Sequence, residues 1–283
     1  MRIILRDAES DKSILQCINE GIILGQAIKR KQRFLADHTQ CCYCGLPATT
    51  IDHFPPRSFF KERNWPVGYE FPACHTCNHA KSHDEQSLGL LVRLIRFDVD
   101  TDSSEFQDTL TAVRNNNPIL MKELAPMSAV ASKIYLRNRF GSAGDVGGMG
   151  LTGWRSYSMG PETNKLTDNM CVWFAQTAWY LHCHSIFEGR IIWSRIESEF
   201  LGHEATQKIV SNLVGHPELL RNGKNVSRDF FYRYFASDDI LVTIFQFGLR
   251  PQMVFVVCAT RKGTVNTDLH LAKYWGQRNI ELA

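Results

Sequence analysis

Two Cys-x-x-Cys pairs constrain this chain more than any other feature of its sequence. The pairs are Cys41/Cys44 and Cys74/Cys77, and 29 residues lie between them. Paired thiols at this spacing can close one tetrahedral site around Zn²⁺, with each sulfur about 2.3 Å from the ion. A site with four protein ligands is closed to substrate, so we expect these cysteines to hold a structural zinc. The neighbouring Cys42 offers a second register with Cys44, but the two-residue gap favours Cys41.

The composition is that of an ordinary globular protein. Hydrophobic residues make up 44% of the 283 residues and charged residues 22%, enough for one large or two modest domains. The opening apolar run ends at Asp7 without a cleavage site, so we expect no signal peptide and a cytoplasmic location. Nine cysteines, an odd number, favour metal binding over a disulfide framework in that compartment. Polar residues interrupt the apolar stretch 170–187, which predicts a buried helix and no membrane contact.

Apolar periodicity divides the chain into a mainly helical front half and a different back half. The predicted helices span 12–36, the residues from Asn78 through Ile95, and 103–139 with breaks at Pro118 and Pro126. Ten residues rich in glycine then begin at Gly141, and past Asp168 we expect one or two buried helices. The predicted strands of an antiparallel meander span 230–236, 240–247 and 253–260.

Chemistry-bearing residues gather between and after the cysteine pairs. Asp52 and His53 follow a β-prone run, and Asn78 follows Cys77 directly. A neutral histidine can deprotonate water, while carboxylate and amide oxygens can hold Mg²⁺ or Mn²⁺ to stabilise charge on a phosphate. Lys81 lies on the same helix face as Asn78, near the positive N-terminus, where it is expected to meet phosphate. This set favours phosphodiester hydrolysis.

The segment 38–90 resembles the zinc-stapled HNH endonucleases of the ββα-metal superfamily. The resemblance rests on the two cysteine pairs, on Asp52-His53-x2-Pro56-x-Ser58, and on Cys77-Asn78-x2-Lys81. It implies that His53 is the general base, that Asp52 and Asn78 bind the catalytic cation, and that the four cysteines bind zinc. The sequence departs from the family at Tyr69, where members often carry an asparagine that braces the histidine loop. Tyr69 either replaces this brace through its hydroxyl or only packs.

The resemblance and the periodicity together predict an α+β fold. A small zinc-bound ββα-metal HNH module is expected within a mostly helical front half, and buried helices with an antiparallel β meander behind it. The expected parts are a nuclease domain at 1–140, a Gly-rich linker or mobile loop at 141–165, and a C-terminal α+β domain at 166–283. The C-terminal domain is expected to serve in targeting, in oligomerisation or in restraint of the nuclease.

Basic residues concentrate around the module, although the whole chain carries only +3. Residues 28–83 contain eight lysines and arginines against four aspartates and glutamates. Phosphate contacts to DNA are predicted for six of the basic residues, namely Lys29, Arg30, Lys31, Arg33, Arg57 and Lys81. A solvated helix face is the equal alternative for the cluster from Lys29 to Arg33.

The sequence therefore predicts a metal-dependent HNH endonuclease that hydrolyses DNA, with nicking as its expected product. A zinc ribbon that binds nucleic acid or protein without cutting is one alternative, and an idle structural partner is another. A small HNH unit beside a large unfamiliar domain also resembles the nuclease effectors of bacterial phage defence, which act with other proteins. A restriction-type enzyme for modified DNA is the second such assignment.

Overall fold

The computed structural model describes most of the chain from Gln26 to Leu282. The described residues are 26–60, 65–96, 100, 102–125, 127–128, 130–131, 134, 160–197, 210–248, 253–264 and 278–282. Residues 12–25 of the first predicted helix and residues 141–159 of the predicted linker lie outside them.

A short hairpin followed by a long helix carries both cysteine pairs. Strand β1 (Thr50–His53) pairs antiparallel with β2 (Glu70–Ala73), so that His53 lies opposite Glu70. Helix α3 (His75–Leu94) follows β2 directly. The β-prone run before Asp52 is thus a strand, as the sequence indicates.

Helix α3 begins three residues earlier than the prediction of Asn78. Cys74 lies at the N-cap, where its sulfur accepts a hydrogen bond from the backbone N–H of Cys77 at 3.4 Å. A side-chain acceptor at this position satisfies a helix N–H that would otherwise lack a partner. The second cysteine pair is therefore itself the first turn of the helix.

Among the described residues, the remaining helices lie largely where helices were predicted, except for a 3₁₀ helix that was not predicted. They are α2 (Gln26–Asp37), the 3₁₀ helix η1 (Arg57–Phe59), α4 (Ser104–Asn116), α5 (Pro118–Glu123) and α7 (Pro161–Cys183). The predicted break at Pro118 is confirmed, because Asn117 ends α4 and caps α5 by accepting a hydrogen bond from Leu120 N. Helix α7 starts inside the range predicted as linker, with a proline in its first turn, where the missing N–H has no intrahelical acceptor.

The back half is an antiparallel sheet of five strands in the order β6-β7-β8-β3-β9. The strands are β3 (Gly189–Glu197), β6 (Phe230–Ala236), β7 (Ile240–Phe247), β8 (Met253–Arg261) and β9 (Arg278–Glu281). The predicted meander of β6, β7 and β8 is confirmed, and β3 adds a long strand that the sequence reading did not identify. A separate two-stranded hairpin joins β4 (Leu220–Arg221) to β5 (Lys224–Asn225).

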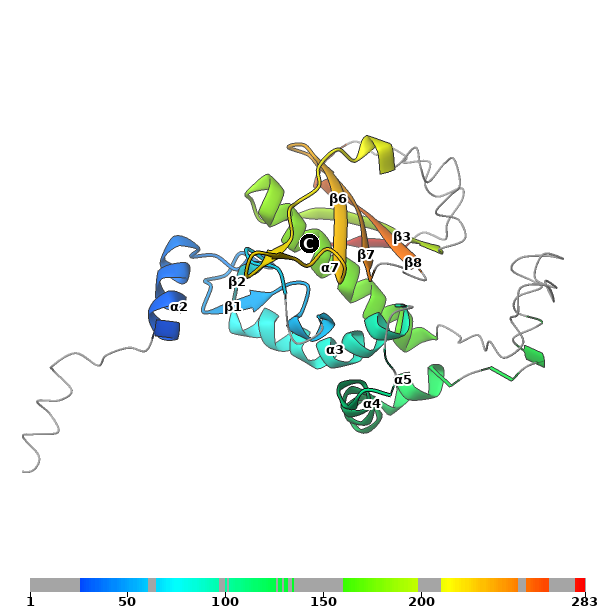
Figure 1. Cartoon of the computed structure of the whole chain (residues 1–283). Coiled ribbons are helices and arrows are strands. Elements are labelled where there is room, and N and C mark those ends of the chain that lie inside the picture. The colour runs from blue at the N-terminus through cyan, green and yellow to red at the C-terminus, as the bar shows by residue number, and fades with distance from the viewer. Residues whose placement is uncertain are drawn as a thin grey trace, which may run out of the picture.

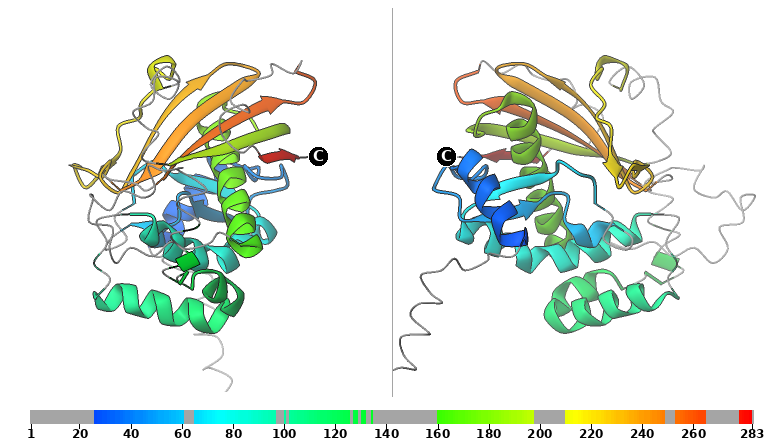
Figure 2. Two further views of the ribbon diagram at one scale, coloured as in Figure 1. Left: turned by 90° about the vertical axis from the view of Figure 1, so that its right-hand side faces the viewer. Right: turned by 60° about the vertical axis from the view of Figure 1, so that its left-hand side comes forward.

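Helix α7 lies between the sheet and α3, and it contacts both (Figure 1). The sheet curves over α7, while α4 lies at the opposite end of the molecule (Figure 2). The aromatic ring of Phe174 on α7 lies 4.1 Å from that of Phe245 on β7. Among the described helices, α7 included, none combines the length and the apolar run that crossing a membrane requires.

One hydrophobic core joins the cysteine-bearing unit to the back half. Phe59 packs edge-to-face on Phe247 with ring centroids 5.3 Å apart, and the Tyr69 hydroxyl donates a hydrogen bond to the Tyr232 hydroxyl at 2.9 Å. All four side chains are buried in the same cluster. The two parts of the chain are thus held together by shared burial of aromatic surface.

Candidate functional site

The four cysteines of the two pairs come together as the sequence predicts. The sulfurs of Cys41, Cys44, Cys74 and Cys77 all lie within 4.8 Å of one another. The sulfurs of Cys44 and Cys74 are 3.7 Å apart, and a tetrahedral site with Zn–S bonds of about 2.3 Å separates its sulfurs by about 3.8 Å. The cluster can therefore bind a metal ion, and its geometry fits zinc.

A tight turn brings the first pair into this cluster. The Gly45 N–H donates to the Cys41 carbonyl at 2.9 Å, and Gly45 has φ +75°, which glycine adopts without strain. The neighbouring Cys42 is fully buried and lies outside the cluster, which settles the choice of register in favour of Cys41. Burial raises the pKa of the Cys42 thiol, so Cys42 stays a neutral core residue.

Asp52 and Lys81 form a buried ion pair between β1 and α3. Asp52 is 3% exposed and Lys81 is 1% exposed. Asp52 Oδ2 accepts hydrogen bonds from Lys81 Nζ and from the Tyr43 hydroxyl, and Oδ1 accepts one from the His53 N–H at 2.8 Å. The ammonium of Lys81 also lies 4.8 Å from the ring centroid of Phe54. Both buried charges are therefore fully engaged inside the protein.

This ion pair differs from the predicted roles of its two members. Lys81 shares a helix face with Asn78 as expected, but Phe54, Tyr43 and α7 cover that face, so Lys81 cannot reach a phosphate in this arrangement. The amide nitrogen of Asn78 donates to Thr50 Oγ1 at 3.3 Å. Because Asp52 is buried and both of its oxygens accept hydrogen bonds, this arrangement gives no support for a divalent cation at Asp52 and Asn78.

His53 lies on the other face of β1, because successive side chains of a strand point to opposite sides. Its Nε2 is hydrogen-bonded to Arg57, lies 3.5 Å from Glu70 Oε1, and its ring packs edge-on against Trp65 at 5.3 Å. Burial and the charge of Arg57 lower the pKa of His53 from 6.5 to about 4, although Glu70 and Asp52 oppose the shift. The imidazole is therefore neutral at physiological pH, as a proton acceptor must be.

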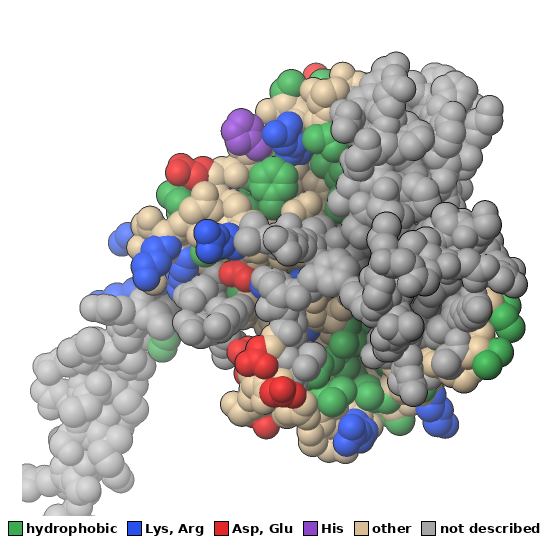
Figure 3. All heavy atoms as spheres, turned by 45° about the vertical axis from the view of Figure 1, so that its right-hand side comes forward, with side chains coloured by type: hydrophobic (Ala, Val, Ile, Leu, Met, Phe, Trp, Pro, Cys, Tyr) green, Lys and Arg blue, Asp and Glu red, His purple; other side chains and the backbone are tan. Residues whose placement is uncertain are grey.

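The predicted basic residues of α2 are exposed. Arg30 binds Glu70 with contacts of 2.5 and 2.6 Å to the two carboxylate oxygens, which links α2 to the strand opposite His53. Lys29, Lys31 and Arg33 point to solvent on the same helix. Lysine and arginine side chains gather along the left-hand edge of the face in Figure 3. This exposure suits phosphate contact, and it equally suits a solvated helix face.

Tyr69 holds the histidine loop through its backbone. Its hydroxyl reaches Tyr232, while its carbonyl accepts a hydrogen bond from the N–H of Phe54, the residue after His53, at 3.3 Å. The side chain therefore packs, and the alternative of a hydroxyl brace is wrong. A main-chain hydrogen bond of the hairpin, and not the Tyr69 side chain, holds the residue after His53.

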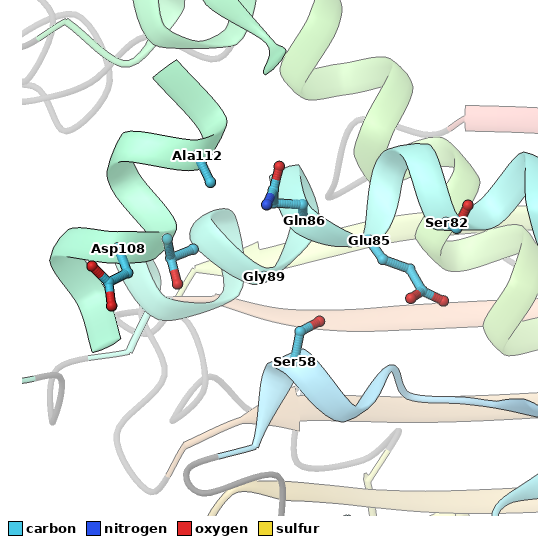
Figure 4. A pocket seen from close by; sticks show the side chains of 8 residues that line it. Ser58, Ser82, Glu85, Gln86, Gly89, Asp108 and Ala112 are labelled. Atoms are coloured by element: carbon cyan, nitrogen blue, oxygen red, sulfur yellow. The ribbon is translucent and has the colours of Figure 1, made fainter. Parts of the chain in front are cut away.

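A cavity of about 450 Å³ lies between α3, α4 and η1. Glu85 and Ser58 point into it from facing elements, with Asp108 on α4 beyond (Figure 4). Burial and the charge of Asp52 raise the pKa of Glu85 to about 7, while Lys81 opposes the shift. Glu85 was not among the predicted site residues, although its position four residues after Lys81 places it on the same helix face.

Trp65 packs against His53 and Arg221 packs against Trp65, and neither residue was predicted. Each residue is partly buried, and the guanidinium carbon of Arg221 lies 3.9 Å from the Trp65 ring centroid. Arg221 is 168 positions from His53 in the chain, so no local pattern could have joined them.

Comparisons with protein-family models, with curated proteins and with solved structures gave no match.

Proposed function

We propose that this chain is an endonuclease of the zinc-stapled HNH type that hydrolyses DNA phosphodiester bonds. The observation that carries the proposal is a neutral histidine, His53, held beside Arg57 on a hairpin-and-helix unit that the four-cysteine cluster closes. Zinc is the proposed ion of that cluster, with a purely structural role.

His53 and Arg57 suit the two needs of the reaction. A neutral imidazole can accept the proton of the attacking water, and a guanidinium can bind the charged phosphate oxygens. Nε2 of His53 is now hydrogen-bonded to Arg57. A phosphate that draws Arg57 to itself would free this nitrogen for the proton of water, so substrate binding would itself activate the base.

The predicted catalytic Mg²⁺ or Mn²⁺ has no support in the present positions of Asp52 and Asn78. Both oxygens of Asp52 already accept hydrogen bonds, and the carboxylate would have to leave Lys81 before it could bind a cation. The same observation favours a second function, a zinc ribbon that binds nucleic acid without cutting it, because such a module needs no free carboxylate.

A supercoiled plasmid assay separates these two functions. The wild type, with and without added Mg²⁺ or Mn²⁺, is expected to produce nicked circles before linear DNA, since one module cuts one strand. His53→Ala should lose cleavage and keep its zinc, whereas the exposed His216 offers a matched control in His216→Ala, which should cleave like the wild type. Wild-type protein that binds the plasmid but leaves it intact under every metal condition would establish the binding module instead.

The pH dependence of cleavage gives a second readout. Because the pKa of His53 is lowered to about 4, the base stays unprotonated as the pH falls from neutrality to about 5. At subsaturating DNA the cleavage rate reports the free enzyme, in which Arg57 contacts His53, so it should persist across the range in which an ordinary histidine, with a pKa near 6.5, would lose it. An acid limb centred at about 6.5 would contradict the proposed base.

We retain a role in bacterial phage defence as a proposal from architecture, with a restriction-type enzyme for modified DNA as the alternative. Expression of the wild type, but not of His53→Ala, should reduce plaque formation in a bacterial host that also carries the partner proteins. Equal plaque counts would remove this assignment and leave the nuclease proposal untouched.

A further inference from the structure

Trp65, which packs against His53, contacts two arginines. The guanidinium carbons of Arg57 and Arg221 each lie 3.9 Å from the centroid of the Trp65 ring. A guanidinium group is nearly as wide as the ring face, so the two cannot stack on the same face. They therefore lie on opposite faces of Trp65, with Arg57 on the side that reaches His53.

A short hairpin of the back half places Arg221 next to Trp65. Arg221 pairs with Lys224 across a two-residue turn, and the turn residues Asn222 and Gly223 have φ of +51° and +72°. Asparagine followed by glycine is the preferred pair for such a turn, because both positions require positive φ. The carbonyl of Leu220 accepts a hydrogen bond from Val67 N at 2.8 Å, which fastens the hairpin next to Trp65.

The charges around Trp65 favour an anion. No ion pair of Arg221 with another described residue is present, and the nearby carboxylate of Glu70 already binds Arg30 at both oxygens. A guanidinium stacked on an indole keeps the N–H groups at its edge available for bidentate contact with phosphate. Arg221 is partly exposed, so such a contact is open to a ligand from solvent.

We propose that Arg221 binds a backbone phosphate of DNA next to the phosphate held at Arg57 and His53. The inference rests on the proposed function for the identity of the substrate, and it makes the back half of the chain part of the binding site. Trp65 sets the separation between the two guanidinium groups. Arg221 is thus a positioning residue. It helps to bind the DNA strand and takes no part in proton transfer.

Salt-dependent DNA binding tests this role without requiring cleavage. The full chain with His53→Ala is titrated onto a fluorescent duplex at several salt concentrations, alone and combined with Arg221→Ala, Arg221→Lys or Arg114→Ala. Arg221→Ala should weaken binding several-fold and reduce the slope of log K against log salt by about one, the signature of one lost phosphate contact. Arg221→Lys should keep the slope, and Arg114→Ala, at an exposed arginine on α4, should change neither quantity.

The possible results separate this inference from the nuclease proposal. Binding that depends on Arg221, in a wild type that never cuts, supports the phosphate contact and refutes the nuclease. If the wild type cleaves DNA but Arg221→Ala changes neither the binding constant nor the salt slope, the phosphate contact alone is refuted. Weaker binding with an unchanged slope would show that Arg221 only supports the fold, and absence of any DNA binding overturns both proposals.

Discussion

At the scale of single residues, the neighbouring side chains of Asp52 and His53 on β1 lie in different chemical surroundings. Asp52 points toward α3 and is buried against Lys81, while His53 points the other way, toward Trp65 and Arg57. Asp52 also accepts the hydrogen bond of the His53 backbone N–H, so the buried pair helps to fix the strand that presents the histidine. The buried ion pair thus helps to hold the backbone of His53 in place.

The Asp52–Lys81 pair should behave as a coupled unit in unfolding experiments. Asp52→Asn and Lys81→Met each leave one buried charge without its counter-charge, which typically costs about 3–5 kcal/mol. The double variant removes both charges, so its loss of stability should be smaller than the sum of the two single losses. Urea unfolding of the four proteins measures this coupling.

Losses of stability that simply add up in the double variant would contradict an interaction between Asp52 and Lys81. Such a result would mean that Asp52 has another partner in solution, and a cation is the candidate that the sequence suggests. Repeating the titrations with Mg²⁺ then distinguishes the cases, because a cation held by Asp52 would stabilise Lys81→Met more than the wild type.

At the scale of elements, the cysteine cluster ties the turn at residues 41–45 to the first turn of α3. Cys74 and Cys77 flank the start of the helix, and β1 and β2 have only four residues each. A hairpin of this length is marginal alone, so the metal is expected to contribute directly to the order of the unit.

Two nearby cysteines, Cys44 and Cys42, provide a matched test of the metal site. Cys44→Ala removes one sulfur ligand and should reduce bound zinc from about one per chain to nearly none, with a lower thermal midpoint. Cys42→Ala, two positions away and outside the cluster, should keep the zinc. Metal analysis of both proteins after gel filtration measures this. Loss of zinc in Cys42→Ala would restore the rejected register, in which Cys42 takes the place of Cys41 and Cys44 remains a ligand.

The features that could be predicted are those that depend on residues close together in the sequence. The meander of β6 to β8 and the break before Pro118 follow from short-range patterns, and both are confirmed. The burial of Lys81 could not be predicted, because Trp173, one of the rings around its ammonium, comes from α7, about ninety positions later in the chain. Helical spacing identified the right face of α3, but only tertiary packing decides whether a face is exposed.

The hairpin that carries Arg221 could be predicted from the local sequence, whereas its place in the fold could not. Asn222-Gly223 is a strong local turn signal, and it is present in the printed sequence between Arg221 and Lys224. Reading it predicts the hairpin but not its position, since contact with Trp65 depends on a hydrogen bond between Val67 and Leu220 across more than 150 residues. His53 and Arg57 were therefore accessible to sequence reasoning, whereas the contacts of Trp65 and Arg221 were not.

At the scale of the whole molecule, the core crosses the boundary that sequence organisation suggests. The parts 1–140 and 166–283 were expected as separate domains. Aromatic side chains from the hairpin and η1 instead pack against the sheet, as in the pairs Phe59–Phe247 and Phe60–Phe230. Each of these four rings is at most 2% exposed in the full chain. The unit that carries His53 thus depends on the back half for much of its buried apolar surface.

A fragment of residues 1–140 should therefore fail to fold alone. Removing the sheet and α7 exposes Phe59, Phe60 and Tyr69 to water, and each fully buried aromatic side chain contributes about 1.5–3 kcal/mol by burial. We expect the fragment to unfold without a cooperative thermal transition and to bind zinc weakly. Co-expression with residues 160–283 should restore both properties, because the shared core can form between the two pieces. A fragment that alone shows a cooperative transition and a dispersed NMR spectrum would demonstrate that residues 1–140 contain a sufficient core, and the contribution of Arg221 would then come from a separately folded domain.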